Sequence, residues 1–443
     1  MSASTTGTTP ADAATAGPKL ADIDLTDLDL FAQRLPHDWF ELLRREAPVW
    51  KHPETAGEEA FWVVSSYDRI AEVHRSGVVY SHQTGPGRDG RGGIALPDSR
   101  PEMGVGTQMV MTDPPAHTRY RKLVNRGFTP RMVARLTETM RLRADLIIDR
   151  IVERGEADFV VDVASELPLM AIADIVGVPM DDRRKLFDWT NQVLGSSDPE
   201  YAADRGEHDV SPGMISLFAY SRELAAKKKT EPGDDLWSRL LGATTTMEDG
   251  TVVELTDFEL DMFFTLLILA GNETTRNAIS GGLVAFLGHR DQWDLLRARP
   301  DLIDTAVEEI LRFTSPVNYF RRTATVDTEL GGQQIRAGEK VTLWYPSGNR
   351  DESVFADPHR FDITRSPNEH MAFGAGGPHY CLGASLAKLE LKVMFGALTR
   401  RLPDIELAGP PERLRSNLLN AIKHLPVRFT PGERVLAEQQ GAG

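Results

Sequence analysis

Cysteine is nearly absent from this sequence: Cys381 is the single one among 443 residues. One thiol can form neither an internal disulfide nor a cysteine-based zinc site, which excludes disulfide scaffolds and zinc fingers. An excess of basic residues is also lacking, because 50 Lys and Arg stand against 65 Asp and Glu, a formal net charge of -15. The chain therefore has no general positive field for phosphates, and we expect no nucleic-acid partner.

Long hydrophobic runs are missing as well. The longest strongly apolar run covers residues 262–270, which as a helix spans about 14 Å, roughly half of a bilayer core. Residues 1–18 lack the basic start and apolar run of a signal peptide. They also hold too few bulky apolar side chains to become ordered. We therefore expect no membrane anchor, a cytoplasmic location and a disordered segment over residues 1–18.

The hydrophobic pattern predicts a mostly helical body with small β-sheets. We expect one large domain over residues 19–430, followed by a flexible tail over 431–443, since no clean linker divides the chain. A loop rich in Gly, Pro, Asp and Arg is expected at 83–107. The predicted helices cover residues 19–46, 67–76, most of 116–287, 302–313 and 381–401. The predicted strands cover residues 49–52, 60–65, 325–330, 334–335, 340–345 and 427–429.

Cys381 follows a loop, residues 373–380, that contains three glycines and a proline. Such a loop lets its backbone approach a bulky planar group closely. A helix is expected directly after the cysteine, and its positive end would lower the pKa of the thiol and favour thiolate. We also expect His379 to be a cation there. A rigidly held thiolate is a good ligand for haem iron. The alternative is a buried structural cysteine in a turn.

A long helix is predicted over residues 257–290, about 50 Å in length. At its centre stands Ala-Gly-Asn-Glu-Thr-Thr, residues 270–275. Gly271 leaves one face flat, and Thr274 can bond back to a carbonyl one turn earlier, which locally opens the helix. Beside the carboxylate of Glu273, an opened turn makes a place for water and proton relay. The alternative is a Thr-rich polar patch on a partly buried helix.

Taken together, the loop and this hexapeptide resemble the haem-binding and oxygen-activation motifs of the cytochrome P-450 monooxygenases. The likeness runs from about residue 20 to 430, although the loop is one residue longer than the common form, at Gly376-Gly377. The resemblance implies the triangular P-450 fold and a haem b whose iron takes its axial thiolate from Cys381. It also implies that Glu273 and Thr274 deliver protons for splitting the O–O bond.

The same resemblance assigns further residues to the haem and its support. Those implied to bind the haem are His117, Arg121, Ala270, Gly271, Arg322, Phe373, Gly374, His379, Cys381 and Gly383. A structural triad is implied for Glu309, Arg312 and Arg360, the last from the segment Pro358-His359-Arg360-Phe361. Spacing alone would make Glu309 and Arg312 an ordinary helical ion pair.

A basic cluster lies on and just beyond the predicted helix that carries His117 and Arg121: Arg119, Lys122, Arg126, Arg131 and Arg135. It is either a plain solvated face or a docking surface for an acidic electron donor. The resemblance implies electrons from NAD(P)H through a ferredoxin reductase and a ferredoxin.

Candidate substrate-pocket residues are mainly apolar, and a core role is the alternative for each. They are Leu267, Ile268, Val317, Asn318, Leu418 and Leu419. Segments 188–191, 198–201 and 411–415, with the longer loop, resemble the actinobacterial branch that oxidises steroids and methyl-branched lipids. This likeness implies insertion of one oxygen atom of O2 into an unactivated C–H bond, by terminal hydroxylation of a steroid side chain or a methyl-branched or isoprenoid lipid.

Other functions remain open at this point. A tailoring hydroxylase of a macrolide or terpenoid, a peroxide-driven haem-thiolate enzyme and a non-catalytic haem or lipid carrier would all use the same loop. Residues 85–90 match the dinucleotide-binding pattern G-x-G-x-x-G, but a glycine-rich loop follows where a helix is needed. We therefore expect no nicotinamide or flavin on this chain.

Overall fold

The structure is a computed structural model that describes residues 17–55, 57–125, 128, 130–202, 210–246 and 250–436. The predicted disordered N-terminal segment lies outside the described residues except for Gly17 and Pro18, and so does the predicted tail beyond Leu436. Within the described ranges, no helix is both long and apolar enough to cross a membrane.

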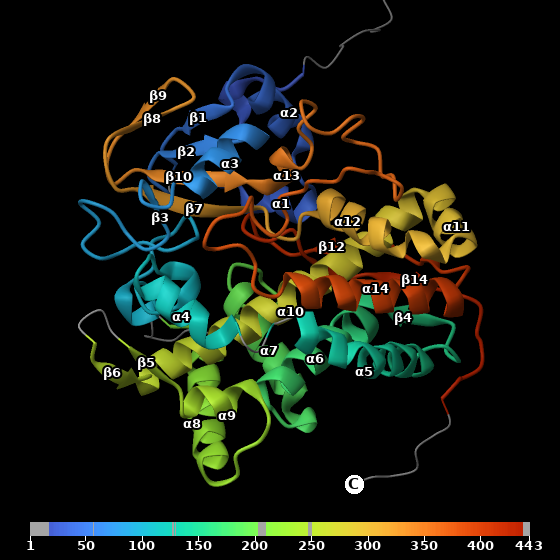
Figure 1. Ribbon diagram of the computed structural model, residues 1–443. Coiled ribbons are helices and arrows are strands. Elements are labelled where there is room, and N and C mark those ends of the chain that lie inside the picture. The colour runs from blue at the N-terminus through green and yellow to red at the C-terminus, as the bar shows by residue number, and fades with distance from the viewer. Residues whose placement is uncertain are drawn as a thin grey trace, which may run out of the picture.

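Helices are the main elements (Figure 1). They are α1 (Leu28–Gln33), α2 (His37–Glu46), α3 (Tyr67–Arg75), α4 (Ala116–Val124), α5 (Pro130–Asp149), α6 (Glu166–Val176), α7 (Arg183–Leu194), α8 (Pro212–Thr230), α9 (Leu236–Leu241), α10 (Asp257–Gly288), α11 (Arg290–Ala298), α12 (Ile303–Thr314), α13 (Tyr345–Gly348) and α14 (Ala384–Arg401).

The strands are short and belong to small sheets, so the predicted fold class is confirmed. They are β1 (Val49–His52), β2 (Phe61–Val64), β3 (Tyr80–Ser81), β4 (Glu156–Asp158), β5 (Thr244–Thr246), β6 (Val252–Glu254), β7 (Tyr319–Ala324), β8 (Thr328–Leu330), β9 (Gln333–Ile335), β10 (Lys340–Trp344), β11 (Glu406–Leu407), β12 (Glu412–Arg413), β13 (Ile422–His424) and β14 (Pro426–Arg428). In the described chain the largest sheet has the order β1-β2-β10-β7-β3, with β2 and β10 parallel and the other pairs antiparallel.

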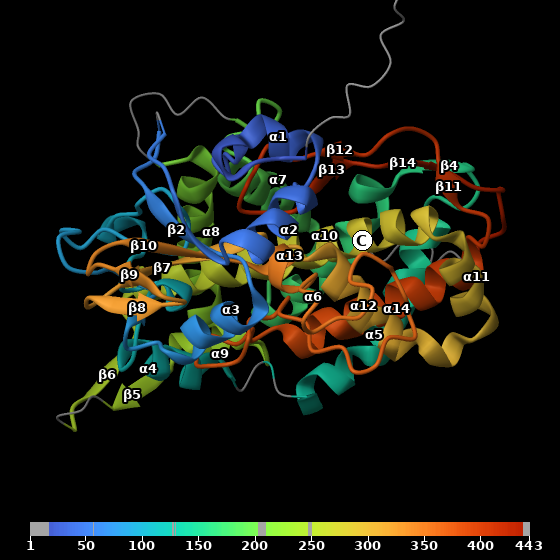
Figure 2. The same cartoon turned by 90° about the horizontal axis from the view of Figure 1, so that it is seen from above.

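The two kinds of element occupy different parts of the molecule. In Figure 1 the large sheet lies in the upper part with α1, α2 and α3, and helices α4 to α9 lie in the lower part. Seen from above, the hairpins β8–β9 and β5–β6 mark one end, and α11 with β4 and β11 marks the other (Figure 2). The long helix α10 runs through the middle of both views.

Helix α10 is central because it is buried on nearly every side. Its start is fixed by Thr256, whose hydroxyl accepts the backbone N–H of Glu259 at 3.2 Å, while Oε2 of Glu259 accepts the N–H of Thr256 at 2.8 Å. This reciprocal cap satisfies amide groups that a helix start leaves unpaired. Helices α6, α7, α8, α12 and α14 all pack against α10, so any residue on it is positioned by the whole core.

The predicted secondary structure differs from the structure in several parts, and the short strands β3, β11, β12 and β13 are among those not predicted. Residues 19–46 form α1 and α2 rather than one helix, because the Asp27 side chain caps α1 and Pro36 precedes α2. Strands β4, β5 and β6 interrupt the run expected to be helical. Strand β7 was not predicted, since both of its faces are largely buried and its arginines, Arg321 and Arg322, obscure the apolar pattern.

Candidate active site

The loop before Cys381 is closed on itself. The backbone N–H of Cys381 donates to the carbonyl of Phe373 at 3.0 Å. Gly374, Gly376 and Gly377 all have positive φ, at 89°, 91° and 80°, a conformation that side chains with a Cβ rarely adopt. A Cβ at Gly377 would also lie 2.7 Å from the carbonyl oxygen of His74. The longer loop is thus accommodated by packing its extra glycine against the end of α3.

The thiol of Cys381 forms part of the wall of a cavity between this loop, α10 and β7. Burial raises the pKa of the thiol, while the amides of Gly383 and Ala384 and the guanidinium of Arg121 oppose that rise. The predicted lowering of this pKa is therefore wrong for the thiol by itself. A coordinated metal deprotonates a thiol outright, and the same amides and guanidinium would then stabilise the thiolate.

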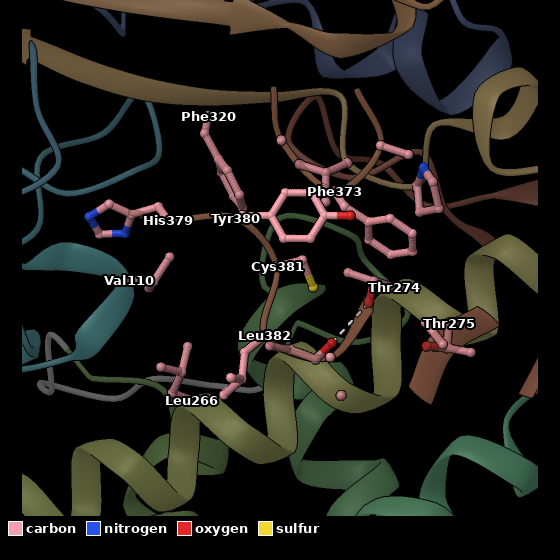
Figure 3. A pocket seen from close by; sticks show the side chains of 18 of the residues that line it. Val110, Leu266, Thr274, Thr275, Phe320, Phe373, His379, Tyr380, Cys381 and Leu382 are labelled. Carbon is pink, nitrogen blue, oxygen red and sulfur yellow. Dashed lines mark hydrogen bonds between the residues drawn. The ribbon is translucent and has the colours of Figure 1, made fainter. Parts of the chain in front are cut away.

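Helix α10 presents Ala270, Gly271 and Thr274 to the same cavity. The Thr274 hydroxyl donates to the carbonyl of Ala270 at 2.9 Å, as predicted. Helix α10 nevertheless continues unbroken through this turn, so the expected opening of the helix is absent from the described chain. Figure 3 shows Cys381 and Thr274 directed toward the same space. A Cβ at Gly271 would lie 3.1 Å from Ile172 of α6, so this glycine also permits close helix packing.

One end of the cavity is lined by basic residues. His117, Arg121, Arg322 and His379, all predicted to bind the haem, meet there. His82, which the sequence analysis missed, stacks on His379 with ring centroids 3.3 Å apart. His82 lies in no motif; β3 brings it into place. Nδ1 of His82, Nδ1 of His117 and Nε2 of His379 are buried without a hydrogen-bond partner, an arrangement that calls for a polar ligand.

These histidines are neutral near pH 7. Burial, together with His117 and Arg322, lowers the pKa of His379 to about 2. Burial and the neighbouring Arg121 lower the pKa of His117 to about 4. Within the protein alone, the positive charge at this end therefore comes from Arg121 and Arg322 rather than from His379, and the imidazoles offer hydrogen bonds.

The residues fit a haem. Cys381 offers a sulfur ligand, the open side of Gly383 leaves space where a Cβ would project, and the orphaned imidazole nitrogens with two guanidiniums suit the carboxylates at a porphyrin edge. Phe373 and Gly374 also line the cavity, as expected. Every residue predicted to contact the haem thus lies in this cavity wall.

Glu273 is placed differently from its partner Thr274. It is 1% exposed and forms a buried ion pair with Arg276, one turn further along α10. Glu273 directly precedes Thr274 on α10, but it is not part of the cavity wall. Burial raises the pKa of its carboxyl, and the charge of Arg276 opposes this.

The predicted substrate residues divide into two groups. Leu267 and Val317 line the cavity, whereas Ile268 is fully buried in the helical core. Asn318 donates to the carbonyl of Asn417 at 3.0 Å instead of facing the cavity. Leu418 and Leu419 pack in an apolar cluster that Val317 also contacts, so the structure does not place these four residues in the cavity wall. Apolar wall residues that were missed are Val110, Phe128, Ile172, Leu266, Phe320 and Leu386.

The predicted structural triad is correct in two of its three members. Glu309 and Arg312 form two hydrogen bonds of 2.7 and 2.8 Å with no exposed surface. The third cation is Arg365, whose Nε lies 3.2 Å from Oε2 of Glu309. Arg360 is exposed and contributes only its backbone carbonyl, which accepts from Arg312 at 3.0 Å. The prediction for Arg360 is therefore wrong.

The side chains of three residues of the predicted basic cluster are described. Arg119 is turned inward and pairs with Glu259. Lys122 and Arg135 are exposed. Arg126 and the side chain of Arg131 lie outside the described residues.

Comparison with known proteins agrees with this site. Residues 217–403 match the family model "Cytochrome P450". The chain is 42% identical to the steroid C26-monooxygenase of Rhodococcus jostii, over 94% of this chain and 87% of that protein. It is 40% identical to the linalool 8-monooxygenase of Pseudomonas putida, over 92% and 99%. A cytochrome P450 of Mycobacterium marinum, solved with pseudoionone, superimposes with a TM-score of 0.82 at 37% identity, covering 94% and 100%.

Both the matched length and the site lead to one assignment. The relatives span almost the whole chain, and the cavity unites a cysteine thiol with residues suited to a haem. The chain belongs to the cytochrome P450 family and is a haem-thiolate monooxygenase.

Proposed function

We propose that this enzyme hydroxylates an apolar isoprenoid-derived substrate, a steroid side chain or a methyl-branched lipid, at or near a terminal methyl group. The observation that carries this is the cavity itself, where the Cys381 thiol and the Thr274 hydroxyl are flanked by a wall of apolar side chains such as Leu267 and Phe320. A wall of this kind binds a hydrocarbon by excluding water from it. The steroid C26-monooxygenase relatives support the steroid class.

When bound, the haem supplies the oxygen-activating chemistry. The protein's part is to hold it and to manage protons. Cys381 would provide the sulfur ligand, and Arg121, Arg322, His117, His379 and His82 would provide charge and hydrogen bonds for the carboxylates of the porphyrin.

Thr274 would supply the hydroxyl of the proton relay, since it lies in the cavity wall. Its proton is engaged by the carbonyl of Ala270, so its oxygen is free to accept a hydrogen bond from a water in the cavity. Glu273, which is buried and adjacent to Thr274 in the sequence, acts as the acid that supplies the next proton to this relay.

Electrons are proposed to come from NAD(P)H through a ferredoxin reductase and a ferredoxin. The exposed residues Lys122 of α4 and Arg135 of α5 are proposed as contacts for such an acidic donor on a chain that is negatively charged overall. Raising the ionic strength should then slow reduction of the enzyme by the ferredoxin.

A direct test uses purified enzyme with a ferredoxin, its reductase and NADPH. Cholest-4-en-3-one, a methyl-branched fatty acid, linalool and a macrolide are first screened for a shift in the haem spin state. Products of the substrates that bind are then analysed under 18O-labelled O2. One labelled oxygen atom on a terminal carbon of the sterol or branched acid supports the proposal. Binding without product formation would favour a carrier, and oxidation of the macrolide alone would contradict the substrate class.

Terpenoid alcohols are a second candidate class. The linalool 8-monooxygenase relative and the pseudoionone complex both concern short isoprenoids. Linalool in the same screen distinguishes this class from sterols. Hydrogen peroxide in place of the electron-transfer proteins tests the peroxide-driven alternative, which we do not favour because Glu273 and Thr274 are both present.

A further inference from the structure

Arg276 holds the carboxyl of Glu273 from within the same helix. The two residues are one turn apart on α10, 2% and 1% exposed, and Nη2 of Arg276 pairs with Oε2 of Glu273. A second nitrogen of the same guanidinium, Nη1, donates to Oδ1 of Asn191 at 2.9 Å. Asn191 belongs to α7, so the guanidinium is anchored across two helices.

The guanidinium has little freedom to leave this position. Phe187, also on α7, places its ring 5.4 Å below the guanidinium carbon. The guanidinium of Arg276 is planar, hydrogen-bonded through two nitrogens and stacked on the Phe187 ring. It can therefore donate hydrogen bonds in one direction only. The position of Oε2 of Glu273 is therefore set by α7 as well as by α10.

Oε1, the other carboxyl oxygen of Glu273, is not paired with Arg276. Oε1 of Glu273 is buried and has no hydrogen-bond partner within normal distance, although the side-chain amide of Asn277 is near enough to lower the pKa of the carboxyl; both side-chain polar atoms of the adjacent Asn272 also lack a partner. Buried polar atoms without protein partners are normally satisfied by ordered water. One oxygen of Glu273 is thus held by arginine, and the other can exchange a proton with water.

From this geometry we propose that Arg276, anchored by Asn191, is a positioning residue for proton delivery: it holds Glu273 so that Oε1 alone transfers the proton. The inference rests on the proposed role of Glu273. Arg276 itself cannot be the donor, because a guanidinium keeps its proton at physiological pH.

The charged and titratable surroundings of Glu273 are few in the described chain. Arg276 faces it from α10, and Tyr201, on the segment after α7, interacts with both Glu273 and Arg276; burial raises the pKa of the Tyr201 hydroxyl. Because Arg276 opposes the rise that burial causes in the pKa of Glu273, its removal should leave Glu273 protonated to higher pH.

The test uses holoenzyme variants Arg276→Gln, Arg276→Lys, Asn191→Ala, Glu273→Gln and the double variant of Arg276→Gln with Glu273→Gln. Product formed per NADPH consumed is measured against pH. We expect Arg276→Gln to lower this coupling by about tenfold, to shift the pH profile upward, and to add nothing to Glu273→Gln in the double variant. Arg276→Lys should recover part of the loss, and Asn191→Ala should show a smaller loss of the same kind.

An infrared measurement on the resting enzyme provides a readout independent of turnover. Arg276→Gln should show one protonated-carboxyl band in addition to that of the buried Glu390, whose pKa burial raises well above its usual value, and the double variant with Glu273→Gln should lack this additional band. If Arg276→Gln and Asn191→Ala keep the wild-type coupling and pH profile while Glu273→Gln is impaired, the inference fails and the proposed function stands. If Glu273→Gln itself is unimpaired, the proposed role of Glu273 fails.

Discussion

Glu309 accepts both Nε and Nη2 of Arg312, at 2.8 and 2.7 Å, in a pair with no exposed surface. The remaining nitrogen, Nη1 of Arg312, donates to the carbonyls of Asn349 and Pro358, both at 2.8 Å. The pair thus ties α12 to the segment that leads into the cysteine loop. It supports the haem site without entering it.

Glu309→Gln should be strongly destabilising, because it leaves the Arg312 charge buried without its partner. We expect a loss of about 3–5 kcal/mol in the free energy of unfolding, measured by denaturant titration. Arg365→Gln should cost less, since Arg365 has further carbonyl partners exposed to water. Arg360→Gln is the matched control and should change stability by less than about 0.5 kcal/mol. Equal losses for Arg360→Gln and Arg365→Gln would contradict the assignment of the third cation.

This network shows where sequence reasoning succeeded and where it failed. The spacing of Glu309 and Arg312 on one helical face predicts their pairing. Which arginine becomes the third cation beside Glu309, Arg360 or Arg365, depends on the path of an irregular segment. Hydrophobic periodicity does not predict that path. The same contrast holds for His82, which reaches the haem site through β3 and lies in no recognisable motif.

Helix periodicity could have resolved one error in the substrate pocket. Leu267, Ala270, Gly271 and Thr274 follow the spacing i, i+3, i+4 and i+7, which places them on one face of α10. Ile268 is off that face and is buried in the core. Leu418 and Leu419 lie in irregular backbone near β13, where burial in the neighbouring cluster could not be predicted from their apolar character alone.

Thr274→Ala should uncouple oxygen consumption from product formation. Loss of the hydroxyl removes the group that accepts a hydrogen bond inside the cavity, so we expect product per NADPH to fall about tenfold and hydrogen peroxide to rise. Thr274→Ser keeps the hydroxyl and should restore most of the coupling.

The control for Thr274 is Thr399→Ala on α14. Thr399 makes the same kind of bond, to the carbonyl of Phe395 at 2.8 Å, but lies outside the cavity wall. Thr399→Ala should therefore leave the amount of product formed per NADPH unchanged. A Thr274→Ala enzyme as tightly coupled as the wild type would remove Thr274 from the proton relay.

Gly377→Ala should weaken the cysteine loop. A Cβ there meets the carbonyl of His74 at 2.7 Å, and φ is 80°, so we expect a loss of about 1–3 kcal/mol in unfolding free energy and a lower haem content. Gly396→Ala on α14 has open space around the new Cβ and should be neutral or stabilising by up to about 1 kcal/mol. Similar behaviour of the two variants would mean that the longer loop is not constrained by α3.

His424 should make stability depend on pH. Burial lowers the pKa of His424, but hydrogen bonds to Asp158 and Glu200 outweigh it and raise the pKa above 6.5. The protonated form therefore stabilises the fold fully below about pH 6.5, and this contribution is lost as pH rises through the folded-state pKa. His424→Gln should be less stable than wild type at about pH 5.5, by no more than about 1 kcal/mol. The difference should shrink by about pH 9; a difference independent of pH would show that His424 acts through packing alone.

Sulfur ligation by Cys381 is the claim on which the whole account depends, and the spectrum of the reduced enzyme under carbon monoxide tests it most directly. We predict the strongly red-shifted Soret band of a thiolate-ligated haem in the wild type, and its complete loss in Cys381→Ser, with monooxygenase turnover lost in parallel. A wild-type band at the position typical of imidazole ligation, or a Cys381→Ser enzyme with an unchanged band and turnover, would contradict the account.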